Sequence, residues 1–433
     1  MTSATGLSRR DFMKNAAAAG AALGGLSILG ATAKGQGRVL KVGLIGCGGR
    51  GNGALAQHVE AARILNGALK WNLEIQVAAV ADYFKHKARP AAEKYGVTRE
   101  RCFSGAEAYK RLLETDVEIV LMATPPAFRP LHFEAAVKAG KHIFMEKPAG
   151  VDPPGCRRVI AAGEEARKKG LMVIAGTHCR HQKNYTENQA AVAAGAIGRI
   201  LGGRVSSCFG HLGALRPIGS LDPRRLVYSW PNWTELSGDF IVEAHIHELD
   251  LMNWFLGTHP VSAVGFGGRA RRPAGNQYDF FSVDYEFPGE VHIHSTCRQM
   301  NGCWNWDGEL FVGERGISRG WQGVRPKPVV PAEIPQQGAG HQQEQIDLLY
   351  YLVKGQLLNQ AHDLATSTAT AVMGRISAYT GQKILWREMM EDPARQPELY
   401  NLQLKPTAED FEGDFDAIAL PEEGVVPLPG TSA

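Results

Sequence analysis

The fold of this chain is decided by the segment VLKVGLIGCGGRG, residues 39–51. Its first seven residues are rich in Val, Leu and Ile, which predicts a short buried strand. Gly46, Gly48 and Gly51 follow with the spacing G-x-G-x-x-G, directly before a helical stretch. There the first glycine permits a tight turn, the second lets the backbone approach a pyrophosphate, and the third lets helix and strand pack closely. The segment predicts the start of a dinucleotide-binding domain, with a structural glycine turn as the alternative.

Predicted strands and helices alternate at short intervals up to residue 176. The strands cover residues 39–45, 75–81, 119–123, 142–145 and 171–175, and the helices cover 54–66, 85–95, 106–113, 131–139 and 154–169. This alternation is typical of a doubly wound parallel sheet with helices on both faces. We therefore assign residues 34–176 to an α/β Rossmann domain.

The pattern changes after Thr177, where strands predominate. The predicted strands cover residues 199–207, 261–269, 280–287, 291–298 and 309–313, and the helices cover 184–194, 239–256, 343–354 and 365–380. Such a mixture predicts an α+β domain over residues 177–388 with a largely antiparallel open sheet. Residues 389–433 are rich in proline and acidic side chains, which predicts an extended tail.

The first 33 residues are set apart from the fold. SRRDFMK (8–14) carries adjacent arginines, a weakly apolar run follows from Ala16 to Ala31, and Ala-Thr-Ala ends at residue 33. This is similar to a twin-arginine export signal and predicts a periplasmic or other extracytoplasmic location. A membrane anchor is the alternative, although the run is short and glycine-rich for a span of roughly 20 apolar residues.

Charge and hydropathy narrow the range of partners. The formal net charge is +3 and no basic block stands out, so a nucleic-acid partner is not expected. No stretch after the signal is long and apolar enough to cross a bilayer. The sequence therefore indicates a small-molecule partner.

The predicted cofactor site lies at the carboxyl end of the parallel sheet. Gly46, Gly48, Gly49, Arg50 and Gly51 would present a helix N-terminus to the phosphates of the dinucleotide. Asp82 ends the second strand, where its carboxylate can accept hydrogen bonds from ribose hydroxyls. Because that carboxylate would repel a 2′-phosphate, NAD is favoured, with NADP as the alternative. Thr124 and Pro125 follow the third strand of the series and would line the ribose-nicotinamide side.

Candidate chemical residues follow a strand and occupy a helix. Glu146-Lys147-Pro148 comes after the strand 142–145, which directs Lys147 into the cleft; a surface lysine before a turn is an equal alternative. Glu243, His247 and Asp250 are spaced i, i+4 and i+7 on the predicted helix 239–256 and would share one face. A histidine titrates near neutrality, so His247 can take a proton from an alcohol and return it.

A metal site in this helix is disfavoured. Glu243, His245 and His247 would have to converge on one ion, but residues at i and i+2 on a helix do not face each other. The sequence therefore predicts acid–base chemistry without a bound metal.

Taken together, the glycine segment, Glu146-Lys147-Pro148 and the helix bearing Glu243, His247 and Asp250 resemble the Gfo/Idh/MocA oxidoreductases. The resemblance extends from residue 39 to about residue 386. It implies that Lys147 contacts the reacting hydroxyl beside the cofactor and that His247 is the acid/base. Glu243 stands where many members carry Asp. The resemblance also implies that Glu146 contacts the cofactor. It implies that the substrate is contacted by Asp250, His178, Arg180 and His181. For residues 178–181, a polar linker between the domains is an equal alternative.

The resemblance implies an NAD(P)-dependent oxidoreductase that acts on a secondary hydroxyl of a sugar, polyol or glycoside, assembled as a dimer or tetramer. An exported enzyme meets little free NAD, so we expect a tightly bound cofactor that is recycled in each turnover. Two alternatives remain at this point. One is an NAD-dependent glycosidase that works by transient ring oxidation and elimination, and the other is a non-catalytic sugar-binding sensor.

Overall fold

The computed structural model describes residues 37–212, 219–325 and 332–430 of the 433-residue chain. The predicted export signal lies outside the described residues. Within the described part of the chain, no helix has both the length and the apolar character needed to cross a membrane.

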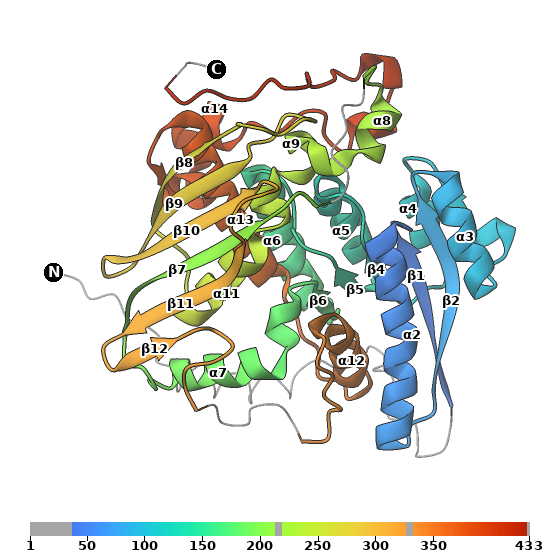
Figure 1. The fold of residues 1–433 in the computed structure, drawn as a ribbon. Helices are drawn as coiled ribbons and strands as arrows, with labels where there is room; N and C mark the ends of the chain where they lie inside the picture. The colour runs from blue at the N-terminus through green and yellow to red at the C-terminus, as the bar shows by residue number, and fades with distance from the viewer. Residues whose placement is uncertain (1–36, 213–218, 326–331, 431–433) are drawn as a thin grey trace. The chain divides into compact units, whose positions relative to one another are not determined.

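The first domain contains a parallel sheet, as predicted, and this sheet has six strands, one more than the five predicted (Figure 1). Its strands are β1 (Arg38–Ile45), β2 (Leu73–Asp82), β3 (Cys102–Ser104), β4 (Ile119–Met122), β5 (His142–Met145) and β6 (Val173–Ala175). Their order in the sheet is β3-β2-β1-β4-β5-β6, so the direction of winding reverses between β1 and β4. Ligands of open α/β sheets bind at the carboxyl ends of the strands beside such a reversal.

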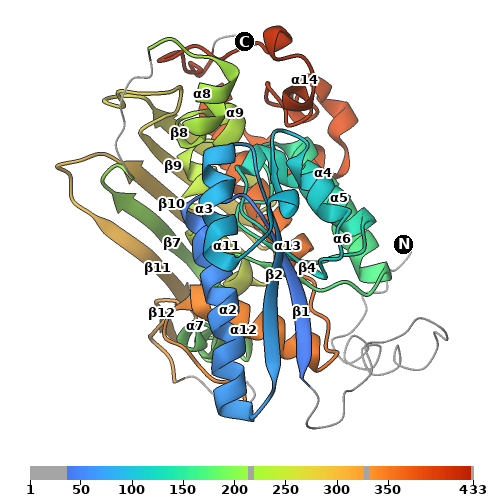
Figure 2. The same ribbon diagram turned by 90° about the vertical axis from the view of Figure 1, so that its right-hand side faces the viewer.

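Helices cover both faces of this sheet. They are α2 (Gly49–Leu69), α3 (Lys85–Tyr95), α4 (Ala108–Leu113), α5 (Arg129–Lys138) and α6 (Pro153–Lys168). Helix α2 begins inside the glycine segment, earlier than predicted, and extends along β1 and β2 (Figure 2). All four residues of β4 are fully buried because helices pack on both of its faces.

The second domain contains a mixed, mostly antiparallel seven-stranded sheet, which confirms the predicted fold class. Its strands are β7 (Ile200–Phe209), β8 (Ser262–Gly268), β9 (Phe280–Phe287), β10 (Val291–Gln299), β11 (Trp306–Gly313), β12 (Gly316–Ser318) and β13 (Ile384–Leu385). The order is β12-β11-β7-β10-β9-β8-β13, with β7 and β10 parallel and the other pairs antiparallel.

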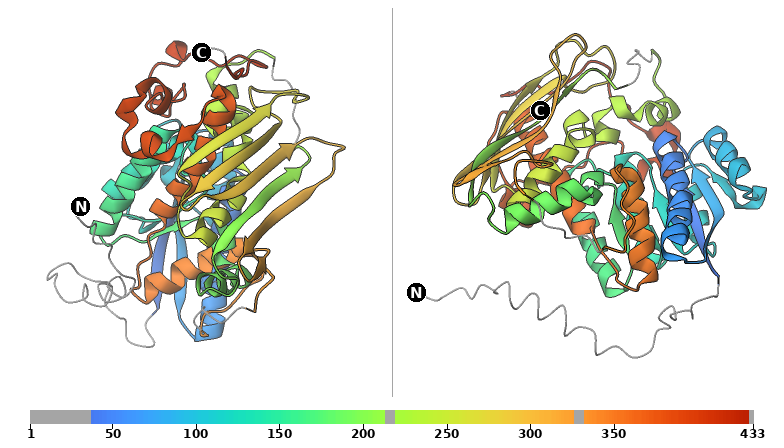
Figure 3. Two further views of the ribbon diagram at one scale, coloured as in Figure 1. Left: turned by 90° about the vertical axis from the view of Figure 1, so that its left-hand side faces the viewer. Right: turned by 60° about the horizontal axis from the view of Figure 1, so that its bottom comes forward.

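One face of this sheet carries the core. In β9, Phe281, Val283, Tyr285 and Phe287 are buried and alternate with more exposed residues, as expected for a strand with one covered face. Helices α11 (Ile246–Leu256) and α13 (Ala361–Thr380) pack on the covered face. The left view in Figure 3 shows the other face, on which no helix of the described residues lies.

The remaining α-helices all follow residue 182 in the sequence. They are α7 (Lys183–Ala193), α8 (Pro223–Tyr228), α9 (Thr234–Ser237), α10 (Phe240–Glu243), α12 (Gly340–Val353) and α14 (Pro397–Tyr400). Although α12 comes late in the sequence, it packs against α2, where Gln345 Oε1 lies 2.9 Å from His58 Nδ1. The second half of the chain therefore supports the helix that starts at the glycine segment.

The single helix predicted over residues 239–256 is wrong. The segment forms two helices, α10 and α11, which are separated at Ala244 and His245. No glycine or proline marks the break. Instead, His245 is fully buried and its Nε2 lies 2.7 Å from Ser295 Oγ on β10. This long-range contact could not be predicted from the local pattern.

Candidate active site

The glycine segment leaves room for a pyrophosphate. Gly46 has a φ of +95°, which favours glycine. A Cβ on Gly51 would lie 1.8 Å from the Gly46 carbonyl oxygen, so close packing of α2 on β1 requires glycine there. A Cβ on Gly48 would meet nothing within 4 Å, and the space beside this residue is open. These positions fit a dinucleotide held at the start of α2.

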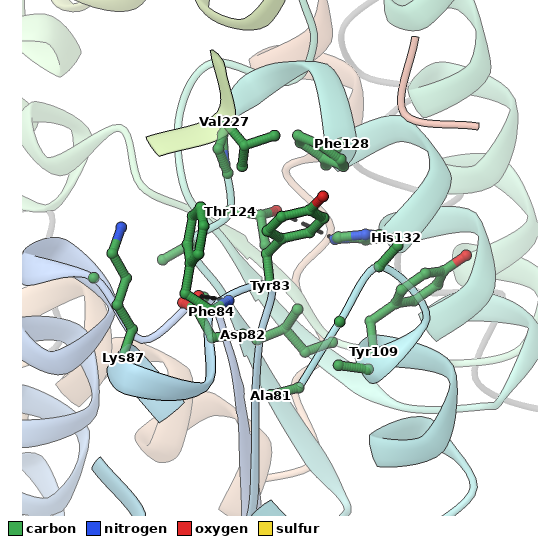
Figure 4. Close-up of a pocket in the computed structure, with 18 of the residues that line it drawn as sticks. Ala81, Asp82, Tyr83, Phe84, Lys87, Tyr109, Thr124, Phe128, His132 and Val227 are labelled. Atoms are coloured by element: carbon green, nitrogen blue, oxygen red, sulfur yellow. Dashed lines mark hydrogen bonds between the residues drawn. The ribbon is translucent and has the colours of Figure 1, made fainter. Parts of the chain in front are cut away.

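A cavity at the ends of β1, β2 and β4 brings together five of the predicted cofactor residues, which are Gly46, Gly48, Asp82, Thr124 and Pro125. Figure 4 shows Asp82, Tyr83 and Phe84 around this cavity, with Thr124 and His132. The prediction missed Tyr83, Phe84 and Lys87 from the first domain and Val227 and Trp230 from the second. The aromatic side chains give this cavity apolar surface suited to an adenine ring.

Asp82 is held in place by backbone groups. Its Oδ2 accepts a hydrogen bond from Cys47 N at 2.7 Å, and its Oδ1 accepts one from Phe84 N at 2.8 Å. Burial raises the pKa of Asp82, and the two hydrogen bonds oppose that shift. Each carboxylate oxygen keeps a further lone pair that can accept from a ribose hydroxyl.

Two predicted cofactor contacts have protein partners instead. Arg50 forms an ion pair with Glu146, and its Nη2 donates to Glu344 Oε1 on α12 at 2.8 Å. Glu146 is 2% exposed, and neither residue is among those that line the cofactor cavity. Their ion pairs hold the first turn of α2, where Gly49 lies, against the end of β5 and α12.

Lys147 and Glu243 meet at the junction of the two domains. Lys147 Nζ donates to the Glu243 carbonyl oxygen at 2.6 Å and to Glu243 Oε1 at 3.0 Å. The carbonyl oxygen is available because α10 ends at Glu243. An ammonium group has three N–H donors, so one remains for a ligand. Glu243 thus contacts the lysine, whereas the sequence suggested a role beside His247.

A second cavity, of about 410 Å³, is lined by Lys147, Glu243, His247 and His178. The His247 and His178 rings lie 4.5 Å apart between centroids, and His341 lies 4.3 Å beyond His178. Burial, together with the charge of Lys147, holds the pKa of His247 well below its usual range. Burial lowers the pKa of His178 to about 3. Both imidazoles are therefore neutral near pH 7, so each has one ring nitrogen that can accept a hydrogen bond.

Several polar residues of this cavity were not predicted. They are Gln182, Tyr185, Ser207, Glu248 and Asp307. Ser207 on β7 donates a hydrogen bond to Asp307 Oδ1 on β11 at 2.7 Å. The sequence feature that could have revealed these residues lies in β11, where Asp307 and Glu309 share a strand face with the buried Phe311. Acidic side chains on the same strand face as a core residue indicate a polar cavity.

Three of the residues predicted to contact the substrate bind other side chains of the protein. Arg180 Nε donates to Asp250 Oδ2 at 2.8 Å, and Nη2 donates to Oδ1 at 2.9 Å. Ser367 Oγ also donates to Asp250, whose side chain is 2% exposed. His181 Nδ1 pairs with Asp347 Oδ2 at 2.7 Å. Asp250, Arg180 and His181 therefore join helices to one another, and His178 alone of the segment 178–181 was both predicted and found at the cavity.

Comparison with solved structures supports the same architecture. Levoglucosan dehydrogenase in complex with NADH has a TM-score of 0.63 at 17% identity, over 80% of this chain and 99% of that chain. The aldose-aldose oxidoreductase of Caulobacter crescentus, complexed with glycerol, has a TM-score of 0.59 at 20% identity, over 80% and 100%. At these identities the likeness shows the fold.

Sequence comparison identifies the family. The inositol 2-dehydrogenase of Burkholderia cenocepacia is 30% identical over 282 residues, which cover 65% of this chain and 73% of that protein. Residues 40–177 match the oxidoreductase family with an NAD-binding Rossmann fold, and residues 185–317 match the GFO/IDH/MocA C-terminal domain. The chain therefore belongs to the Gfo/Idh/MocA family of NAD-binding oxidoreductases.

Proposed function

We propose that this chain is an NAD-dependent oxidoreductase that acts on a secondary hydroxyl of a sugar, polyol or glycoside. The observation that carries the proposal is that Lys147 and His247, which lie on different domains, line one cavity. Relatives and structural neighbours named as inositol, levoglucosan and aldose oxidoreductases support a polyhydroxylated substrate.

Residues of this chain can stabilise the substrate oxygen and remove its proton in such a reaction. When bound, the nicotinamide supplies the carbon that takes a hydride from the substrate. The free N–H of Lys147 would donate to the substrate oxygen and stabilise the negative charge that develops there. His247 is neutral and has no hydrogen-bond partner for Nδ1 among the described residues, so it can take the hydroxyl proton.

The cofactor cavity favours NAD and close retention of it. Asp82 would repel a 2′-phosphate. Val227 and Trp230 bring second-domain surface to the cavity, and the C-terminal residue Phe411 packs edge-on to Tyr83 with centroids 6.4 Å apart. A dinucleotide enclosed in this way would leave slowly, which suits an enzyme that recycles one cofactor.

Export is part of the proposal and is supported by the sequence SRRDFMK (8–14). A fusion of residues 1–40 to a reporter that functions only outside the cytoplasm tests it. We expect export that depends on the twin-arginine route and is lost when Arg9 and Arg10 are both replaced by Lys. Retention of the reporter in the cytoplasm would contradict this part of the proposal.

We also propose that the chain is a homo-oligomer. Figure 3 shows the helix-free face of the second sheet. Val264, Phe266 and Phe280 are exposed on this sheet, and Phe266 is 69% exposed. Large apolar groups gathered on one face are typical of an interface. Sedimentation should show a dimer or tetramer that Phe266→Asp weakens, and a monomer at all concentrations would contradict it.

The activity itself is tested with the purified full chain. Its acid extract should contain NAD, and a panel of sugars, polyols and chromogenic glycosides should include a compound that reduces the bound cofactor. Protein without any dinucleotide, or no change at the reduced-nicotinamide band with any compound, would overturn the proposal. Release of the aglycone without net reduction would instead favour the glycosidase.

A further inference from the structure

Part of the C-terminal tail contacts both domains. We call residues 404–418 the strap. Near its start, Leu404 N donates to Asp152 Oδ2, at the beginning of α6, at 3.0 Å. Near its end, the centroid of the Phe415 ring lies 5.7 Å from Cζ of Arg224 on α8. The strap therefore joins a helix of the first domain to a helix of the second, although the sequence predicted only an extended tail.

Phe411 of the strap packs against two aromatic rings of the cofactor cavity. Its ring centroid lies 5.3 Å from that of Phe128 and 6.4 Å from that of Tyr83. Phe128 and Tyr83 both line the cavity, as Figure 4 shows. Phe411 is 1% exposed and shares one apolar cluster with Val227, which brings second-domain surface to the same cavity. The strap thus supports the aromatic wall of the cofactor cavity.

Glu412 of the strap holds a third residue of this wall. Tyr109 Oη donates to Glu412 Oε1 at 2.8 Å, and Lys110 Nζ donates to Glu412 Oε2 at 2.8 Å. Burial, together with Glu412, raises the pKa of Tyr109, so the phenol keeps its proton near pH 7 and remains a donor. Tyr109 lines the cavity, and its ring centroid lies 4.0 Å from that of His132, another lining residue. Loss of Glu412 would leave the Tyr109 hydroxyl without this acceptor and its ring less restrained.

The strap can act on a bound dinucleotide only through these neighbours. Among the described residues that line the cavity, none belongs to the strap. Side chains that packing has already fixed lose less conformational entropy when a ligand binds, so a supported wall binds more tightly than a loose one. Family membership rests on residues 40–177 and 185–317 and implies nothing about this segment. Its role has to be inferred from its own contacts.

We propose that the strap positions Tyr83, Tyr109 and Phe128 for the adenine end of NAD, so that the cofactor is held tightly only while the strap is docked. This inference rests on the proposed function, because it assigns retention of the cofactor to one segment of the chain. The coupling is reciprocal: if docking of the strap raises the affinity for NAD by some factor, bound NAD stabilises the docked strap by the same factor. Two effects are therefore expected, one on the ligand and one on the strap.

The first test measures binding and release of NADH by the full chain. Titration gives the Kd, and displacement of bound NADH by excess NAD in a stopped-flow fluorimeter gives the release rate. We expect Phe411→Ala and Glu412→Ala each to weaken binding by about tenfold or more, through faster release, the effect typical of losing a hydrogen bond to a charged group. ADP-ribose, which has no nicotinamide, should show the same loss of affinity. Glu422→Ala and Val425→Ala, exposed residues later in the tail, are the matched controls and should behave as the wild type.

The second test measures the strap of the wild-type chain. Amide hydrogen exchange over residues 404–418 should slow by about the same factor when NADH or ADP-ribose is bound, because the coupling is reciprocal. Exchange over residues 422–430 should change far less. This measurement needs no variant, so it decides even if Phe411→Ala fails to fold, and a purely structural role of the strap would not produce it. Equal exchange of the strap with and without ligand, or unchanged release from both strap variants, would overturn the inference.

The outcomes separate this inference from the proposed function. Unchanged NADH affinity in both strap variants, with a sugar or polyol still oxidised, would refute the role of the strap and leave the proposed function standing. Binding of NADH that depends on the strap, without any compound that reduces bound NAD, would refute the proposed activity and leave the role of the strap standing.

Discussion

Lys147 Nζ donates a hydrogen bond to the carbonyl oxygen of Glu243 at 2.6 Å, across 96 positions of sequence. The contact joins the end of β5 in the first domain to the end of α10 in the second. It depends on the break between α10 and α11, which leaves that carbonyl oxygen without a helical partner. The position of the lysine is thus set by both domains.

Replacing Lys147 by Ala should lower kcat/KM by about 10²–10³, the loss typical of removing one donor to a developing oxyanion. The loss arises because no other ammonium group among the described residues lines the cavity. Steady-state kinetics on the best neutral substrate measures it. Lys138→Ala, on the exposed face of α5, is the control. A Lys147→Ala enzyme that retains bound NAD and full activity would contradict the assignment.

Glu243→Gln should be milder than Lys147→Ala. The substitution removes the ion pair but keeps the backbone hydrogen bond from Lys147 to the carbonyl oxygen of residue 243. We expect kcat to fall by roughly tenfold, the equivalent of about 1.4 kcal/mol, with little change in KM. Separate measurement of kcat and KM checks this. A rise in KM at constant kcat would show that Glu243 binds substrate instead of positioning the lysine.

His247→Asn should lower kcat/KM by about 10²–10⁴, the range for loss of a general base. In the wild type, the lowered pKa keeps His247 neutral as the pH falls, so its acid limb should lie below the ordinary histidine pKa of about 6.5. A pH profile of kcat/KM with a neutral substrate measures the limb. His362→Asn, an exposed histidine, is the control. An acid limb at or above the ordinary value would be inconsistent with a buried neutral base.

Arg180→Met should affect stability more than catalysis. It leaves the Asp250 carboxylate buried, with Ser367 as its remaining side-chain partner among the described residues. An uncompensated buried charge costs about 3–5 kcal/mol of unfolding free energy. Urea unfolding of the NAD-loaded protein measures this loss. The double variant Arg180→Met/Asp250→Leu should recover part of it. Unchanged stability together with weakened substrate binding would contradict this prediction and would indicate that Arg180 contacts the substrate.

Much of the fold could be predicted from local pattern. The helix Lys85–Tyr95 and the strands His142–Met145 and Phe280–Phe287 have the predicted bounds, because burial on one or two faces leaves a clear periodicity. The three-residue strand β3 was missed since so short a segment has no period. The break at Ala244 and His245 was missed because its partner, Ser295, lies 50 residues away.

The candidate site also contains residues that the sequence could predict and residues that it could not. Gly46, Asp82 and Lys147 could be predicted because each directly follows or ends a strand of a parallel sheet, and such ends share one edge. Asp250 lies on α11 with His247, but its carboxylate pairs with Arg180, 70 residues away in sequence, and helical spacing does not encode this pair. Glu248 and Tyr185 were missed since their place at the cavity depends on how α7 and α11 pack on the second sheet, which no local spacing encodes.

The central claim is that Lys147 and His247 act on the same substrate hydroxyl. A double-variant cycle of kcat/KM with Lys147→Ala and His247→Asn tests it most directly. If the two residues act as a unit, the double variant should be little worse than the more damaged single variant. If the two losses instead multiply in full, the residues act independently and the account is contradicted.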